Sequence, residues 1–320
     1  MIGVSDNSCA CLTSPADNDA AAIEIFEAAR EDCPALRHIY LPDDTWPDFK
    51  AWHAKRDVVA EHQSTLLLAL RRGHLARLTG PVHQYFIENG TLRPDVRREY
   101  VRAMRERWMF YADPLERHQK YRMFAGRIAE LQFAEWLETT QGWTIAGLEA
   151  LREGPDVEAR PAAGAVTAFE VKFIDTEDDD FKRVLRSLAE GPSVGWVSPY
   201  DAVNYLLLRA YEAAKQLARL EGPRVAVLII SGLTWWRFDW QLKNGWVDWS
   251  NPSFLYGSQS WERFLNEQEK RYPNIRSELP SVIRAIDAVW IMERSGGYKF
   301  RLAYELPMSP QPVRPEPHGL

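Results

Sequence analysis

The sequence is poor in cysteine and has no hydrophobic run long enough to cross a bilayer. Its three cysteines, Cys9, Cys11 and Cys33, lie near the N-terminus, and no histidine pair or second cysteine cluster completes a zinc site. This pattern favours free thiols in a reducing compartment over a disulfide framework. The first residues also lack the basic and apolar segments of a secretory signal. We therefore expect a cytoplasmic protein with no membrane partner.

The chain also lacks an excess of basic residues, because its formal net charge is -6 over 320 residues. A protein that coats nucleic acid generally needs a basic surface, so this charge argues against a non-enzymatic coat protein. It does not argue against an enzyme, since a local basic face is sufficient. The hydrophobic residues, 46% of the chain, are enough for a sizeable core.

The N-terminal part of the chain has the patterns of helices. Residues 1–20 are small and polar, and we expect them to be disordered. Residues 21–118 are expected to form an N-terminal helical region, with helices over 57–72 and, directly after Pro94, over 95–112. Within it, the segment Arg93 to Arg127 has an excess of five positive charges.

This basic segment has two interpretations, a solvated helix face or a face that contacts phosphates. Under the second, the residues expected to contact nucleic acid are Arg97, Arg98, Arg102, Arg105, Lys120 and Arg127.

Residues 119–306 alternate between helix and strand patterns. A helix over 121–138 precedes strands expected over 143–151, from Asp156, and over 165–174. A helix from Pro199 to Leu220 then precedes a fully apolar strand, 224–230, and two late strands follow. Such an order indicates a mixed α/β sheet with helices on both faces. The proline-rich tail, 307–320, should be unpacked.

An insertion over about 232–283 interrupts this domain and is rich in tryptophan. It forms either a small satellite core or an aromatic platform for unstacked bases. Its six tryptophans are Trp235, Trp236, Trp240, Trp246, Trp249 and Trp261.

The segment 154–172, GPDVEARPAAGAVTAFEVK, carries the most specific chemical pattern of the chain. Side chains alternate between the two faces of a strand, so Glu170 and Lys172 point to the same face. Burying two charges on one face is costly unless they have partners. Either this face is solvated, as in an ordinary polar hairpin, or the two charges belong to a site.

Asp156 opens the preceding strand directly after a proline, and a hairpin would bring it next to Glu170. Two carboxylates brought close repel each other unless a proton or a cation lies between them. Mg2+ prefers such oxygen ligands and commonly uses one or two carboxylates. We therefore predict a Mg2+ site held by Asp156 and Glu170, with the backbone carbonyl of Val171 as a further ligand. Lys172 would position the attacking water or neutralise charge in the transition state.

Glu130 is the one charged residue on a small and apolar stripe of the helix expected over 121–138. The other members of the stripe are Gly126, Phe133, Ala134 and Leu137. Glu130 should therefore face the sheet and need a partner there, which a metal-bound water would provide. The alternatives are that Glu130 lies at the surface, or that Glu135 takes this role.

Together, Glu130, Pro155-Asp156 and Glu170-Val171-Lys172 resemble the motif of the PD-(D/E)XK nuclease superfamily, which includes restriction endonucleases, recombination exonucleases and junction resolvases. The resemblance covers about residues 121–230 and includes the family's order of helix, three strands, helix and strand. It implies an α/β fold with a restriction-endonuclease-like core, a mixed β-sheet flanked by helices in the order αβββαβ. The N-terminal helical region and the Trp-rich insertion are additions to that core.

The resemblance also implies roles for the residues. Asp156 and Glu170 would ligate Mg2+, for which Mn2+ can substitute, Lys172 would serve the water, and Glu130 would support the metal shell. Many members carry a further polar residue on the helix after the third strand. Lys215 or Gln216 matches it here, unless both lie on a solvated face.

The function expected from the resemblance is Mg2+-dependent hydrolysis of phosphodiester bonds in DNA, leaving 5′-phosphate and 3′-hydroxyl ends. The size and architecture are typical of a bacterial restriction or anti-phage defence effector. Its partners would be DNA and a second copy of the chain or further subunits of such a system. The alternatives are an RNA-processing nuclease and a non-catalytic nucleic-acid-binding module with the same fold.

Overall fold

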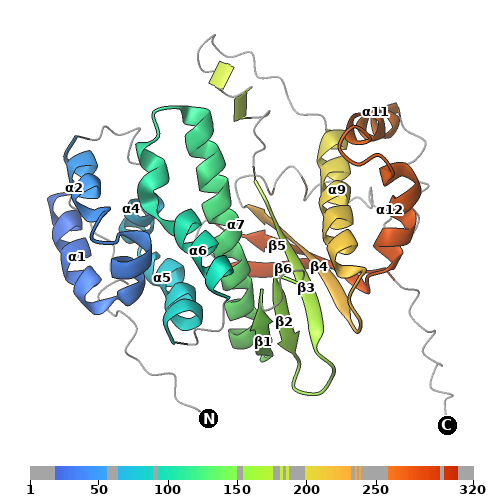
Figure 1. Cartoon of the computed structure of the whole chain (residues 1–320), viewed down its shortest axis with the longest axis horizontal. Coiled ribbons are helices and arrows are strands. Elements are labelled where there is room, and N and C mark those ends of the chain that lie inside the picture. Colours follow the sequence, from blue (N-terminus) through green and yellow to red (C-terminus); the bar gives the residue numbers. More distant parts are fainter. Residues whose placement is uncertain are drawn as a thin grey trace. The chain divides into compact units, whose positions relative to one another are not determined.

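The structure is a computed structural model whose described residues divide into two compact units (Figure 1). The first unit takes the described residues up to Thr139, and the second takes most of those that follow. The described residues are 19–55, 64–88, 93–149, 154–175, 181–182, 185–186, 199–231, 235, 238, 259–295 and 299–308.

The first unit is helical over its described residues, as the sequence predicts for residues 21–118. The helix of residues 121–138 also belongs to this unit and begins earlier than expected, at Pro114. The elements are α1 (Asp19–Asp32), η2 (Leu36–Tyr40), α2 (Trp46–Lys55), α4 (Thr65–Arg71), α5 (Leu75–Val82), η3 (His83–Glu88), α6 (Pro94–Met104), η4 (Glu106–Phe110) and α7 (Pro114–Thr139).

The expectation of one helix over 95–112 is wrong. Helix α6 begins with proline at its first turn, a position where the missing N–H is harmless, and it ends at Met104. Arg105 then has an extended backbone, with φ -60° and ψ 131°, before the 3-10 helix η4. The break lets the fully buried Glu106 accept a hydrogen bond of 3.2 Å from the N–H of Leu66, in the first turn of α4.

The described strands form one six-stranded mixed sheet in the order β1-β2-β3-β4-β5-β6. Strands β3, β4 and β5 are parallel to one another, while β1, β2 and β6 run antiparallel to their neighbours. The strands are β1 (Thr144–Leu148), β2 (Val157–Arg160), β3 (Thr167–Ile174), β4 (Arg224–Ser231), β5 (Ala288–Arg294) and β6 (Phe300–Pro307). The helices of this unit are α9 (Pro199–Leu217), α11 (Gln259–Gln268) and α12 (Ile275–Arg284).

The centre of the sheet is buried, as the apolar run of β4 predicts. Helix α9 contacts β3 and β4, and α11 and α12 contact α9 (Figure 1). The chain turns from α9 into β4 at Gly222, where φ is 84°, a conformation that glycine adopts without steric cost. The core on this side of the sheet is therefore built by α9, α12 and the parallel strands.

The Trp-rich insertion is described in part. It contributes α11 and α12, and the largely buried Trp235 packs in the core next to Tyr304, with ring centroids 6.5 Å apart. This position fits the satellite-core interpretation for Trp235. The side chains of Trp236, Trp240, Trp246, Trp249 and Trp261 lie outside the described residues, as does the tail from residue 309.

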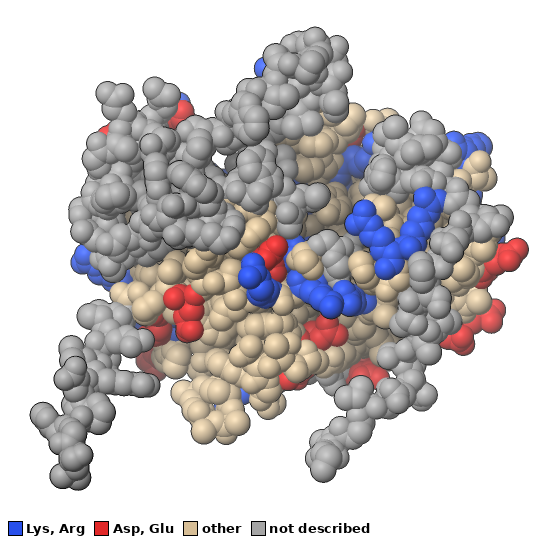
Figure 2. All heavy atoms as spheres, turned by 180° about the vertical axis from the view of Figure 1, so that it is seen from behind, with Lys and Arg blue, Asp and Glu red and all other residues tan. Residues whose placement is uncertain are grey.

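No helix within the described part of the chain combines the length and the apolar character needed to cross a membrane. On the face shown in Figure 2, lysine and arginine side chains form separate patches with acidic side chains between them. Local basic patches therefore coexist with the negative net charge of the chain.

Candidate metal centre

Asp156 lies at the start of β2 and reaches across to β3. The antiparallel register pairs Val157 with Phe169, which places the preceding Asp156 beside the middle of β3. Oδ2 of Asp156 accepts a hydrogen bond of 2.7 Å from the backbone N–H of Val171. This bond orients the carboxylate, because a backbone amide in a sheet cannot move independently of its strand.

Glu170 and Lys172 form an ion pair on β3. Nζ of Lys172 lies 2.6 Å from Oε1 of Glu170, whose residue is only 1% exposed. The lysine side chain keeps 23% of its surface exposed. A solvated polar hairpin would leave the glutamate in water, so the burial of Glu170 excludes that interpretation. A buried carboxylate needs a charged partner, and Lys172 provides one.

The expected helix residue next to this pair is Gln216, not Lys215. Nζ of Lys172 donates a hydrogen bond of 2.8 Å to Oε1 of Gln216, which lies on α9. The adjacent Lys215 is turned toward α12, where its Nζ lies 3.0 Å from Oε2 of Glu278. Of the two candidates, Gln216 therefore contacts the centre, and Lys215 joins two helices.

Glu149 is a third carboxylate that the sequence interpretation missed. One of its oxygens lies within 4.8 Å of a carboxylate oxygen of Asp156. Its backbone has a φ of 40°, in the left-handed region that a residue with a side chain rarely adopts. The N–H of Glu149 donates a hydrogen bond of 2.9 Å to the carbonyl of Asp156, which holds this conformation. The strand was expected to run to Leu151, and it ends instead at Leu148, so Glu149 lies at a bend directly after the strand.

These carboxylates affect one another electrostatically. Burial, together with the charge of Glu170 and to a smaller extent that of Glu149, raises the pKa of Asp156 to about 8, although Lys172 and the Val171 N–H oppose the rise. Asp156 is thus repelled by two neighbouring carboxylates, and a divalent cation would relieve this repulsion. The donors are all carboxylate oxygens, a set that suits Mg2+ or Mn2+ rather than zinc. The chemistry of the residues therefore fits the expected ion.

At Val171, the contact that the structure shows is through the backbone N–H. The expected role of its carbonyl as a ligand stays a prediction. The same holds for Glu130, which belongs to the first unit and lies on α7 with 8% of its surface exposed. The hydroxyl of Tyr100 donates a hydrogen bond to Glu130, and Nη1 of Arg127 lies 3.0 Å from its Oε2.

The six basic residues expected to contact nucleic acid are in different environments. Arg127 bridges Glu130 and Glu99, and Arg105 pairs with Asp44 at 3.3 Å. Arg97 lies over the ring of Phe86, with its guanidinium carbon 5.7 Å from the centroid. The other three, Arg98, Arg102 and Lys120, line a pocket of the first unit.

Comparisons of the chain with protein-family models, with curated proteins and with solved structures return no significant match.

Proposed function

We propose that the protein is a Mg2+-dependent nuclease that hydrolyses DNA phosphodiester bonds, and that it acts as a bacterial restriction or anti-phage defence effector. One observation carries the nuclease proposal. Asp156 and Glu170, on neighbouring strands, present carboxylates next to Lys172, which is bonded to Glu170 and to Gln216.

Asp156 and Glu170 would hold the ion, with Glu149 as an additional carboxylate. The bound cation would supply Lewis-acid stabilisation of the charge that develops on the phosphoryl oxygens. Without a cation, Glu170 and Glu149 both repel Asp156, so the chain itself favours binding of a divalent ion at this position.

Lys172 supplies the fixed positive charge of the centre. Its ammonium group is held between Oε1 of Glu170 and Oε1 of Gln216, at 2.6 and 2.8 Å. A lysine held in this way is a compact cation that donates hydrogen bonds to a water or a phosphate oxygen. Because the two acceptors fix its position in advance, little reorganisation is needed when charge develops on the substrate. Gln216 thus acts as a positioning residue.

The metal proposal is tested by calorimetric titration of Mg2+ into the EDTA-stripped protein. Asp156→Asn keeps an oxygen that can accept from Val171 and removes the charge, so we expect folded protein with Mg2+ affinity at least about tenfold weaker. Glu267→Gln makes the same change of charge at an exposed position on α11 and should leave Mg2+ binding unchanged. Equal Mg2+ affinity in the native protein and in Asp156→Asn would overturn the proposal.

The substrate is tested by incubation with plasmid, linear duplex and single-stranded DNA and with RNA, each with Mg2+ and with EDTA. We expect Mg2+-dependent cleavage of DNA that is lost in Lys172→Ala. Cleavage of RNA alone would support the RNA-processing alternative. Binding of nucleic acid and Mg2+ with no cleavage of any substrate would support a non-catalytic module.

A further inference from the structure

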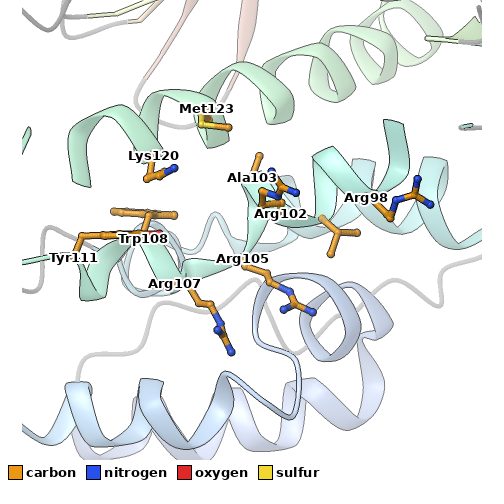
Figure 3. A pocket seen from close by; sticks show the side chains of 10 residues that line it. Arg98, Arg102, Ala103, Arg105, Arg107, Trp108, Tyr111, Lys120 and Met123 are labelled. Atoms are coloured by element: carbon orange, nitrogen blue, oxygen red, sulfur yellow. The ribbon is translucent and has the colours of Figure 1, made fainter. Parts of the chain in front are cut away.

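A pocket of about 400 Å³ lies within the first unit, between α6, η4 and the first part of α7. Its size falls within the range typical of small-molecule sites, roughly 300 to 1,000 Å³. Figure 3 shows Lys120 and Met123 on α7, facing Trp108 and Arg102 across the pocket. The residues that line it are Arg98, Val101, Arg102, Ala103, Arg105, Arg107, Trp108, Tyr111, Lys120 and Met123.

Half of these residues are cationic, and their charge is only partly compensated. Asp44 forms ion pairs with two of the cations, since its Oδ2 lies 3.3 Å from Nη1 of Arg105 and 2.9 Å from Nη2 of Arg107. Among the described residues, no carboxylate forms an ion pair with Arg98, Arg102 or Lys120. Arg98 and Arg102 are four residues apart on α6 and therefore lie on the same side of the helix. Like charges gathered around one cavity repel each other, and an anion in the cavity would relieve that repulsion.

The rest of the lining is apolar and aromatic. Tyr111 is half-buried, and Nζ of Lys120 lies 6.0 Å from the centroid of its ring. Met123, which is 48% exposed, presents its apolar side chain to the pocket. The indole Nε1 of Trp108 is buried and has no hydrogen-bond partner among the described residues. The pocket thus has a cationic lining and an apolar, aromatic lining, which we call its two sides.

These two sides limit the class of ligand. An inorganic anion would neutralise the cationic side chains. It would fill only a small part of the pocket volume, however, and the apolar lining would stay exposed to water. A purely apolar molecule would leave Arg98, Arg102 and Lys120 without a counter-charge. A ligand with a phosphate at one end and a planar ring at the other matches both sides, because guanidinium groups bind phosphate and aromatic faces stack on bases.

We propose that this pocket binds a single nucleoside phosphate, with the phosphate held by Arg98, Arg102 and Lys120 and the base lying against Tyr111 and Met123. The ligand is either a free nucleotide or one unstacked nucleotide of a single strand, since both present the same groups. The site lies in the first unit and is independent of the proposed metal centre, so it can be present even if the protein is not a nuclease.

The test is calorimetric titration of the full chain in EDTA, so that no Mg2+-dependent cleavage contributes. The probes are deoxyadenosine 5′-monophosphate, deoxyadenosine and inorganic phosphate. We expect the nucleotide to bind at least tenfold more tightly than either fragment, because only the nucleotide contacts both sides of the pocket. Equal binding of the nucleotide and inorganic phosphate would overturn the role of the apolar lining, and no binding of the nucleotide or of any strand would overturn the proposal.

A second set of probes distinguishes the two sources of the ligand. These are a short single-stranded DNA of three nucleotides with a 5′-phosphate and the same strand without it. Binding of the mononucleotide at least as tightly as the strands identifies a free nucleotide, and tighter binding of the strands identifies an unstacked nucleotide of a strand.

Variants locate the binding in the pocket. Arg102→Gln and Lys120→Gln should each weaken nucleotide binding about tenfold, since each removes a charged hydrogen bond to phosphate. Met123→Ser should weaken binding of the nucleotide and leave binding of inorganic phosphate unchanged. Arg37→Gln is the control, because Arg37 is an exposed arginine of the same unit outside the pocket. If Arg37→Gln weakens binding as much as Arg102→Gln does, the binding reflects general charge and the pocket assignment is wrong.

Discussion

Nζ of Lys172 donates a hydrogen bond of 2.8 Å to Oε1 of Gln216 on α9. The preceding residue of the same helix, Lys215, does not contact Lys172 in this way. Lys215 is bonded to Glu278 of α12 instead. Two adjacent residues of one helix therefore have separate roles, one at the proposed centre and one between helices.

The first prediction concerns this pair. Gln216→Ala should lower kcat for DNA cleavage about 10- to 100-fold, because Lys172 loses one of the two acceptors that orient it. KM for DNA should change little, since Gln216 positions Lys172 rather than the substrate. Steady-state kinetics on a short duplex measure both constants.

Lys215→Ala is the matched control, and its kcat should stay within about twofold of the native value. Gln216→Glu keeps an acceptor for Lys172 and should restore part of the activity. A larger loss of kcat in Lys215→Ala than in Gln216→Ala would contradict the positioning role of Gln216.

The second prediction separates stability from metal binding at Glu149. The left-handed backbone there costs a residue with a side chain about 1 kcal/mol, and glycine avoids this cost. Glu149→Gly should therefore unfold at equal or higher urea concentration than Glu149→Gln. Both variants should bind Mg2+ more weakly than the native protein, because both lack the third carboxylate. Native Mg2+ affinity in both variants would remove Glu149 from the proposed site.

The third prediction concerns Glu106, which is fully buried and accepts a hydrogen bond from the N–H of Leu66. Burial raises the pKa of Glu106 from 4.5 to about 8. In the unfolded chain the group loses its proton near pH 4.5, whereas in the folded protein it keeps the proton up to about pH 8. The stabilising effect of this proton is therefore fully present below pH 4.5 and is lost as the pH rises to 8.

Glu106→Gln should abolish this dependence, because glutamine does not titrate. The free energy of unfolding of the native protein minus that of Glu106→Gln should fall between pH 5 and 8, by at most about 1.4 kcal/mol per pH unit. Urea denaturation of both proteins at four pH values measures this difference in the free energy of unfolding. Groups that titrate equally in both proteins cancel in the subtraction. A difference that is constant over this range would show that Glu106 is ionised in the fold.

The fourth prediction concerns Arg127, whose Nη1 lies 3.0 Å from Oε2 of the buried Glu130. Arg127→Met should lower the free energy of unfolding by about 1 to 3 kcal/mol, since Glu130 would lose a charged partner at a partly exposed site. Arg98→Met, at an exposed position on α6, should change it by less than about 0.5 kcal/mol. Urea denaturation of the two variants measures both values. If Arg127→Met and Arg98→Met are equally stable and Arg127→Met binds DNA more weakly than the native protein, the result would support the nucleic-acid contact expected for Arg127 from the sequence.

The sequence predicts the α/β class and the main strands because their signals are local. The run RVAVLII forms the buried β4, and the β-branched and aromatic residues of AVTAFEVKFI include β3. Helix α9 ends at Leu217 rather than at the expected Leu220, and Gly222-Pro223 lies between this end and β4. The break in the helix after Met104 is not local, because it depends on Glu106 reaching the first turn of α4, forty positions away along the chain.

For the candidate site, too, one part could be predicted from local sequence signals and another part depends on tertiary packing. Strand alternation and the hairpin suffice to predict that Asp156, Glu170 and Lys172 come together, since period and register follow from the residues of two adjacent strands. The choice between Lys215 and Gln216 depends on how α9 is rotated against β3, because consecutive helix residues point about 100° apart. That rotation is decided by the packing of the apolar face of α9 on the sheet, and the ion pair of Lys215 with Glu278 of α12 is part of the same arrangement. The sequence by itself thus determined which residues of the two strands come together, and the tertiary structure decided which side chains from the helix and from the bend at Glu149 join them.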